Sequence, residues 1–383
     1  MTPPSAQPSL HDDYRTNNFD LIRLFAALQV ASVHVLGNFK PPGLAVAILD
    51  AGLRLFPGVP IFFVISGVLV SRSYERSGSV RDYYRNRCLR IFPALWVCLV
   101  VSIGLVVLQI HVPGAIDTVS SGDWIVWWAA QMSLFQQYSP HFLHGLRLNG
   151  SLWTIPVELE FYLLLPLLYG LFRLGRRAHW PLLAVLAGSV AIHLVFIRME
   201  PGSLPAQYGF VLDTLAPYLW IFLTGVLIQR NWNTLRSWFA GRAHWWLLGY
   251  VLAGAICREY FHIGVGSNDI TPGFLLPLAG VVMSCAMSAR GLAHRILAGN
   301  DISYGTYIYH MPVVAVMLQL GAAGNITLAA VAVGVSAGLG ALSWICVEKP
   351  FLRQKRGALR SVPAASAQAV GLPAAARTHG PAA

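Results

Sequence analysis

A basic side chain and an imidazole share the first apolar run of this chain. Arg23 and His34 are eleven residues apart in that run. Eleven steps of an α-helix turn through about 1100°, which puts both side chains on one helix face, about 16 Å apart along the axis. Ionisable groups inside a membrane are costly and commonly mark a functional site, so His34 is a candidate for chemistry. The alternatives are a neutral hydrogen bond between helices for His34, and for Arg23 an ion pair with Asp20.

A pair of arginines comes next. Arg87 and Arg90 are three residues apart, just before another apolar run, and would share one helix face. Paired guanidinium groups suit a phosphate-bearing ligand, because each presents a planar fork of donors. The alternative is that both belong to the ordinary excess of basic residues on the cytoplasmic side of a membrane protein.

Two carboxylates open a later apolar run. Glu158 and Glu160 follow Trp153, and Glu158 can reach Tyr162 one helical turn further on. At least one of these acids is a candidate to orient a histidine or to bind a hydroxyl-rich acceptor, while the other can simply be solvated.

A second histidine lies among tyrosines near the end of the chain. Tyr304, Tyr307 and His310 precede Pro312, and one helical turn separates Tyr307 from His310. Pro312 should kink a helix just past the histidine. This combination suggests a hydrogen-bonded network that lines a cavity, and a purely structural role for His310 is an equal alternative.

The elements that must position these side chains are membrane helices. Apolar residues make up 56% of the 383 and charged residues only 11%, whereas a soluble domain carries about 25% charged residues. We therefore predict an all-α integral membrane fold with about ten transmembrane helices. The expected spans are 19–37, 56–73, 91–112, 152–172, 180–197, 210–229, 244–263, 272–289, 302–320 and 326–347.

Details of two spans stand out. Prolines and a glycine in the stretch 56–60 predict a bent or broken second span, whose freed backbone groups must face protein or a wet cavity. Gly334, Gly338 and Gly340 offer the last span a small-residue face for close packing.

Charge predicts the orientation. Most of the 27 lysines and arginines fall in alternate connections, so both termini are expected in the cytoplasm, and the net charge of +11 requires no nucleic-acid partner. The five scattered cysteines suggest neither a zinc site nor a disulfide framework. We expect residues 1–18 to form a poorly ordered cytoplasmic segment, 19–355 the membrane domain, and 356–383 a disordered cytoplasmic tail.

The motifs together resemble the family 3 integral-membrane acyltransferases. The resemblance covers about residues 15–355 and departs from the family at Trp153-Thr154-Ile155, where Trp-Ser-Leu is usual, and in the displacement of the second acid to Glu160. It is carried by Arg23-x10-His34, the stretch 62–69 with Ser66, Arg87-x-x-Arg90, Trp153 through Glu158 to Tyr162, the stretch 302–312, and 347–351.

The resemblance implies an activity and roles for these residues. Members of the family take an acyl group, usually acetyl, from acyl-CoA and place it on a hydroxyl of a surface glycan, a nodulation factor or a macrolide. It implies that Arg87 and Arg90 hold CoA phosphates, that Arg23 steers the thioester, that His34 is the general base, and that Glu158 orients the imidazole or the sugar. The residues implied to line a tunnel or acceptor site are Ser66, Trp153, Tyr162, Tyr304, Tyr307 and His310.

The expected partners are acyl-CoA as donor substrate, a glycan or lipid-linked sugar as acceptor, and the lipid bilayer. We expect no metal and no further cofactor, and a multi-pass location in the bacterial inner membrane. A covalent acyl-histidine is a less favoured variant of the mechanism. A macrolide-like glycoside is the alternative acceptor, and a flippase or transporter of lipid-linked sugars is the alternative class of protein.

Overall fold

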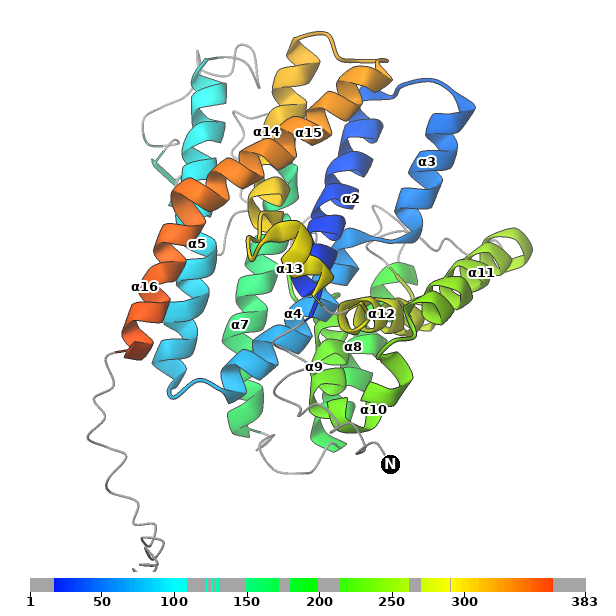
Figure 1. Cartoon of the computed structure of the whole chain (residues 1–383), viewed down its shortest axis with the longest axis vertical. Helices are drawn as coiled ribbons and strands as arrows, with labels where there is room; N and C mark the ends of the chain where they lie inside the picture. Colours follow the sequence, from blue (N-terminus) through cyan, green and yellow to red (C-terminus); the bar gives the residue numbers. More distant parts are fainter. Residues whose placement is uncertain are drawn as a thin grey trace, which may run out of the picture.

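The helical content predicted from the sequence is confirmed. The computed structural model describes residues 17–108, 149–171, 180–198, 214–261, 270–289 and 291–360, together with Gly122, Ile125, Val126, Ala129 and Ala130. All regular elements within these residues are helices, and Figure 1 shows several of them standing side by side as a bundle.

The described helices are named here in chain order, and those that form the site come from both halves of the chain. In chain order they are α2 (Phe19–Phe39), α3 (Leu44–Leu55), α4 (Gly58–Glu75), α5 (Val80–Val107), η2 (Gly150–Trp153), α7 (Thr154–Leu171), α8 (Trp180–Arg198), α9 (Leu219–Arg230), α10 (Trp232–Phe239), α11 (Ala243–Phe261), α12 (Pro272–Met287), α13 (Leu292–Leu297), α14 (Ser303–Gln319), α15 (Ile326–Ser343), the π-helical η4 (Trp344–Glu348) and α16 (Lys349–Arg360).

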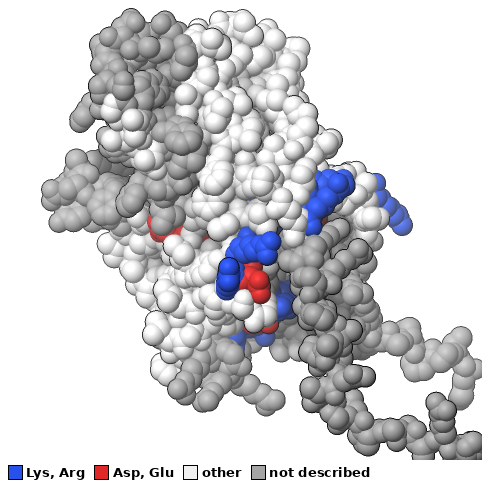
Figure 2. All heavy atoms as spheres, turned by 90° about the vertical axis from the view of Figure 1, so that its left-hand side faces the viewer, with Lys and Arg blue, Asp and Glu red and all other residues white. Residues whose placement is uncertain are grey.

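The chain is a membrane protein by the length and composition of its helices. Within the described residues, five helical stretches are long and apolar enough to cross a bilayer. They are 19–39, 44–75, 80–105, 150–171 and 326–354. On the face seen in Figure 2, a broad upper area carries no charged side chain, and lysines, arginines and acids gather below it, as expected for a surface in contact with lipid. The total of ten spans and the cytoplasmic position of both termini stay predictions.

The predicted break in the second span is confirmed, and a buried glutamine stabilises it. Helix α3 ends at Leu55 and α4 begins at Gly58, so the break falls on Phe56 and Pro57. The Gln29 amide of α2 donates to the Leu53 carbonyl at 2.9 Å and accepts from the Gly58 N–H at 2.8 Å. Backbone groups freed by the break are thus satisfied by protein, which a low-dielectric interior requires.

Close helix crossings depend on glycine. A side chain on Gly67 of α4 or Gly225 of α9 would lie under 3.0 Å from the backbone of the opposite helix. Of the three glycines predicted to form a close-packing face on α15, only Gly340 does so, against Gly305 and Thr306 of α14. Gly334 and Gly338 face open space.

The ends of several elements differ from the sequence prediction. Helix α5 begins at Val80 instead of 91, and Arg87 and Arg90 lie three residues apart within it, as the shared helix face predicted. Asn18, assigned to the poorly ordered N-terminal segment, is 3% exposed and donates to the Ser288 carbonyl at 2.6 Å. Helix α16 extends through Arg360, into the segment expected to be disordered. The rest of both predicted terminal segments lies outside the described residues.

We predict that Gly67→Ala and Gly225→Ala each destabilise the protein, because the added methyl group meets backbone that cannot move aside. Overpacking of this kind costs about 1–3 kcal/mol. The loss should appear as a lower apparent melting temperature in detergent micelles. Gly334→Ala is the matched control, since nothing lies within 4 Å of the added atom. Equal melting temperatures for Gly67→Ala and the control would contradict the tight α4–α9 crossing.

Candidate active site

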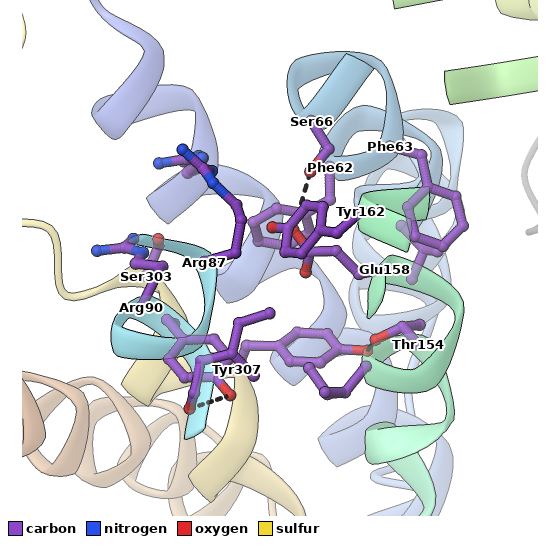
Figure 3. A pocket seen from close by; sticks show the side chains of 15 residues that line it. Phe62, Phe63, Ser66, Arg87, Arg90, Thr154, Glu158, Tyr162, Ser303 and Tyr307 are labelled. Carbon is purple, nitrogen blue, oxygen red and sulfur yellow. Dashed lines mark hydrogen bonds between the residues drawn. The ribbon is translucent and has the colours of Figure 1, made fainter. Parts of the chain in front are cut away.

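A polar pocket forms where α2, α4, α5, α7 and α14 meet. It holds eight of the eleven candidate residues proposed from the sequence. Those eight are Arg23, Ser66, Arg87, Arg90, Glu158, Tyr162, Tyr304 and Tyr307. In Figure 3, Arg87, Arg90 and Ser303 lie along one side of this pocket, and Glu158, Phe63 and Thr154 along the other. The pocket is narrow, with a volume of about 70 Å³.

One buried carboxylate holds two of the arginines. Arg23 Nη1 lies 3.2 Å from Asp301 Oδ2, and Arg90 Nη2 contacts the same oxygen. Ser303 donates to the other oxygen of Asp301, at 2.5 Å from its hydroxyl. Burial raises the pKa of Asp301, but Arg90 and Arg23 outweigh that effect and lower the pKa to about 2. Asp301 is therefore a carboxylate at physiological pH.

Asp301 was not among the residues proposed from the sequence. The signal that could have found it is an acid directly before an apolar span, in a chain whose first span carries an arginine. The ion pair with Asp20 considered for Arg23 also forms, at 3.8 Å, which is longer than the contact with Asp301.

Arg87 is held differently from its two neighbours. Its Nη2 donates to Ser73 Oγ at 2.8 Å, and its guanidinium carbon lies 5.5 Å from the centre of the Tyr162 ring. Its Nε is buried and makes no hydrogen bond. In the described part of the chain, Arg87 forms no ion pair with a carboxylate. An orphaned buried donor of this kind fits an anionic ligand.

Glu158 is the acid that belongs to the pocket. Ser66 donates to its Oε1 at 2.9 Å, and the Tyr162 hydroxyl donates to the same oxygen, as the i, i+4 spacing predicted. Glu160 points elsewhere, since its Oε2 accepts from the Leu215 N–H at 2.7 Å. Glu158 therefore belongs to the pocket, whereas Glu160 binds the backbone of Leu215.

The two histidines meet each other. His34 Nδ1 lies 2.8 Å from His310 Nε2, and the two rings are nearly parallel, at 8°. His310 is fully buried, and its Nδ1 contacts the Tyr307 carbonyl. The Tyr307 hydroxyl donates to the Ser151 carbonyl at 2.8 Å and lies 2.8 Å from Thr154 Oγ1. His34 is thus oriented by His310, and Glu158 makes no hydrogen bond with it.

A second cavity, of about 300 Å³, lies on the other side of Tyr307. His34 and Trp153 line this cavity and not the first one. Val59 and Tyr307 line both, so these two side chains form the wall between the cavities. Arg23 and His34 share a face of α2 as predicted, yet each serves a different cavity. Among the described residues, no group of three or more His, Cys, Asp or Glu could hold a metal ion.

The chain is similar to known proteins over nearly its whole length. It is 32% identical over 361 residues to nodulation protein 10 of Rhizobium leguminosarum bv. viciae, covering 90% of this chain and 95% of that protein. It is 27% identical to an O-acetyl transferase of Shigella phage Sf6, over 88% of this chain and 97% of the phage protein. It is 23% identical to the acyltransferase MdmB of Streptomyces mycarofaciens, over 87% of this chain and 90% of MdmB.

No solved structure matches the chain. The family 3 acyltransferase model, described as an acyltransferase domain, matches residues 16–347 and so covers every motif in which the resemblance was seen except the last, 347–351, of which it includes only Val347. With a relative at 32% identity aligned over nearly the whole length of both proteins, the chain belongs to the family 3 integral-membrane acyltransferases.

Proposed function

We propose that this protein transfers an acetyl group from acetyl-CoA to a hydroxyl of a glycan during surface polysaccharide biosynthesis in a bacterial inner membrane. The observation that carries the proposal is the pairing of an arginine-lined pocket with a histidine-lined cavity across a shared wall. The names of the relatives, a nodulation protein and an O-acetyl transferase, support the same class of reaction.

The arginine pocket is the proposed donor site. CoA carries phosphates and a thin, flexible pantetheine arm. Arg87 lines the pocket and forms no ion pair in the described part of the chain, and Arg23 and Arg90 share a single Asp301, so the pocket has guanidinium charge left for an anion. A volume of about 70 Å³ suits the thin arm and not the nucleotide, which would stay outside the bundle at the end where α4 and α5 connect. The charge pattern of the sequence predicts that this end is cytoplasmic.

The histidine cavity is the proposed acceptor site. Trp153 offers an indole ring on which a sugar can stack, and Asn38 and Arg54 add polar groups beside His34. His34 removes the proton of the acceptor hydroxyl as its oxygen attacks the thioester carbonyl. The new C–O bond forms, the C–S bond breaks, and the proton passes from His34 to the CoA sulfur. A macrolide-like glycoside, one of the acceptors that the family resemblance implies, is the second candidate acceptor.

We predict that Arg87→Lys raises the KM for acetyl-CoA by about tenfold, because lysine supplies a point charge without the planar fork and cannot stack on Tyr162 as guanidinium does. The measurement is the initial rate of acetyl transfer by purified protein against acetyl-CoA concentration. Arg85→Lys is the matched control, since Arg85 is exposed on the same helix and lies outside the pocket. Full activity of Arg87→Lys at low acetyl-CoA would argue against bidentate binding of phosphate by Arg87.

We predict that His34→Ala lowers transfer by about 10² to 10⁴, the range expected for a missing general base. Membranes with wild type or variant at equal protein level would receive radiolabelled acetyl-CoA, and label would be counted in polysaccharide and lipid fractions. His244→Ala is the control, because His244 is exposed and lines neither cavity. Equal labelling by wild type and His34→Ala would remove His34 from the reaction. No labelling by wild type would turn attention to another donor, a missing acceptor or the transport alternative.

We predict that Asp301→Asn destabilises the protein by about 3–5 kcal/mol, because it leaves two buried arginines without their shared counter-charge. The apparent melting temperature should fall, and the KM for acetyl-CoA should rise as the two guanidinium groups move apart. Asp50→Asn is the control for stability, since its ion pair with Arg54 is partly exposed and worth about 0–1 kcal/mol. An unchanged melting temperature for Asp301→Asn would show that the arginines do not depend on this acid.

A further inference from the structure

The contact between His310 and a backbone carbonyl determines where one proton must lie. His310 Nδ1 faces the carbonyl oxygen of Tyr307, and a carbonyl oxygen can only accept a hydrogen bond. The proton must therefore be on Nδ1 of His310. The alternative tautomer would place a nitrogen lone pair against an oxygen lone pair, inside a fully buried site.

Burial then determines the charge of His310. Its side chain is 0% exposed, and no carboxylate in the described part of the chain forms an ion pair with it. An unpaired charge in such a place is costly, so His310 is neutral. A neutral imidazole with its proton on Nδ1 has a lone pair on Nε2, which makes Nε2 an acceptor.

The same reasoning determines the tautomer of His34. His34 Nδ1 lies 2.8 Å from His310 Nε2, and one hydrogen bond between two nitrogens needs one proton. Because His310 Nε2 accepts, His34 Nδ1 donates. A neutral His34 therefore keeps its lone pair on Nε2. His34 lines the second cavity, and its Nε2 has no hydrogen-bond partner among the described residues.

We propose that His310 is a positioning residue that fixes His34 in the tautomer with an unprotonated Nε2 directed to the acceptor cavity. The Tyr307 carbonyl holds the proton of His310 on Nδ1, and the lone pair on Nε2 of His310 then holds the proton of His34 on Nδ1, so two successive hydrogen bonds determine the tautomer of His34. This inference rests on the proposed function for its consequence in catalysis, but the tautomer itself does not. In the opposite tautomer, Nε2 would carry a proton and could not act as a base.

The pair also fits the state that follows proton transfer. When Nε2 of His34 takes the acceptor proton, the ring becomes an imidazolium and still donates from Nδ1 to the lone pair of neutral His310. His310 gains no proton. The proton on Nε2 of His34 is then the one delivered to the sulfur of the departing CoA, so protons balance without any transfer between the rings.

Two amide substitutions separate this role from simple packing. His310→Gln places an amide near the position of Nε2, where its oxygen can accept from His34. His310→Asn is one carbon shorter, so its amide can still donate to the Tyr307 carbonyl but does not reach His34. The two variants are otherwise similar in polarity. A residue needed only to fill space or to cap the carbonyl would tolerate Asn at least as well as Gln.

The first test is nitrogen NMR of the full chain in detergent micelles with ¹⁵N-labelled histidine. The His34 signals, among those of 12 histidines, are identified by their loss in His34→Ala. We expect a protonated Nδ1 and an unprotonated Nε2 for His34 in wild type and in His310→Gln, and a mixture of tautomers in His310→Asn. A protonated Nε2 together with an unprotonated Nδ1 for His34 in wild type would overturn the inference, whatever the variants do.

The second test is the rate of acetyl transfer. We expect kcat to fall by about 10- to 100-fold in His310→Asn, as for lost partners that orient a reacting histidine, and His310→Gln to retain most of it. The KM for acetyl-CoA should stay unchanged in both, because the donor pocket is on the other side of Tyr307. Equal kcat values for Gln and Asn would overturn the inference. Absence of transfer by wild type would instead count against acetyl-CoA as donor or against the acceptor supplied, and the NMR result would still decide the tautomer.

Discussion

The shared carboxylate of Asp301 is the interaction on which the site most depends. Two arginines from different helices, Arg23 of α2 and Arg90 of α5, reach one oxygen at the start of α14. Neither guanidinium could be buried alone without a large desolvation cost. One acid between two bases ties three helices together and still leaves the pocket short of negative charge. The same contact thus stabilises the fold and prepares the pocket for an anion.

A second constraint is that an apolar interior leaves no backbone group without a partner. The α3–α4 break is closed by Gln29 and by the Tyr250 hydroxyl, which donates to the Leu55 carbonyl at 2.7 Å. Irregular backbone therefore occurs where polar side chains can satisfy it, and the break after Leu55 adjoins the second cavity, which Pro57 and Gly58 line.

Relations within one helix could be predicted from the sequence, and relations between helices could not. The period of the helix was enough to place Arg23 with His34, and Glu158 with Tyr162. The pairing of His34 with His310 spans 276 residues and depends on how α2 packs against α14. The similar apolar composition of the spans does not indicate which of them pack against each other. For the same reason the sequence suggested Glu158 as a partner for the imidazole, whereas Glu158 is held by Ser66 and Tyr162.

Tyr307 links the two halves of the site. Its side chain stands in the wall between the cavities and is fixed there by Ser151 and Thr154, while its carbonyl faces His310. The side chain of Tyr307 thus forms part of the wall, and the carbonyl of the same residue determines the tautomers of the two histidines.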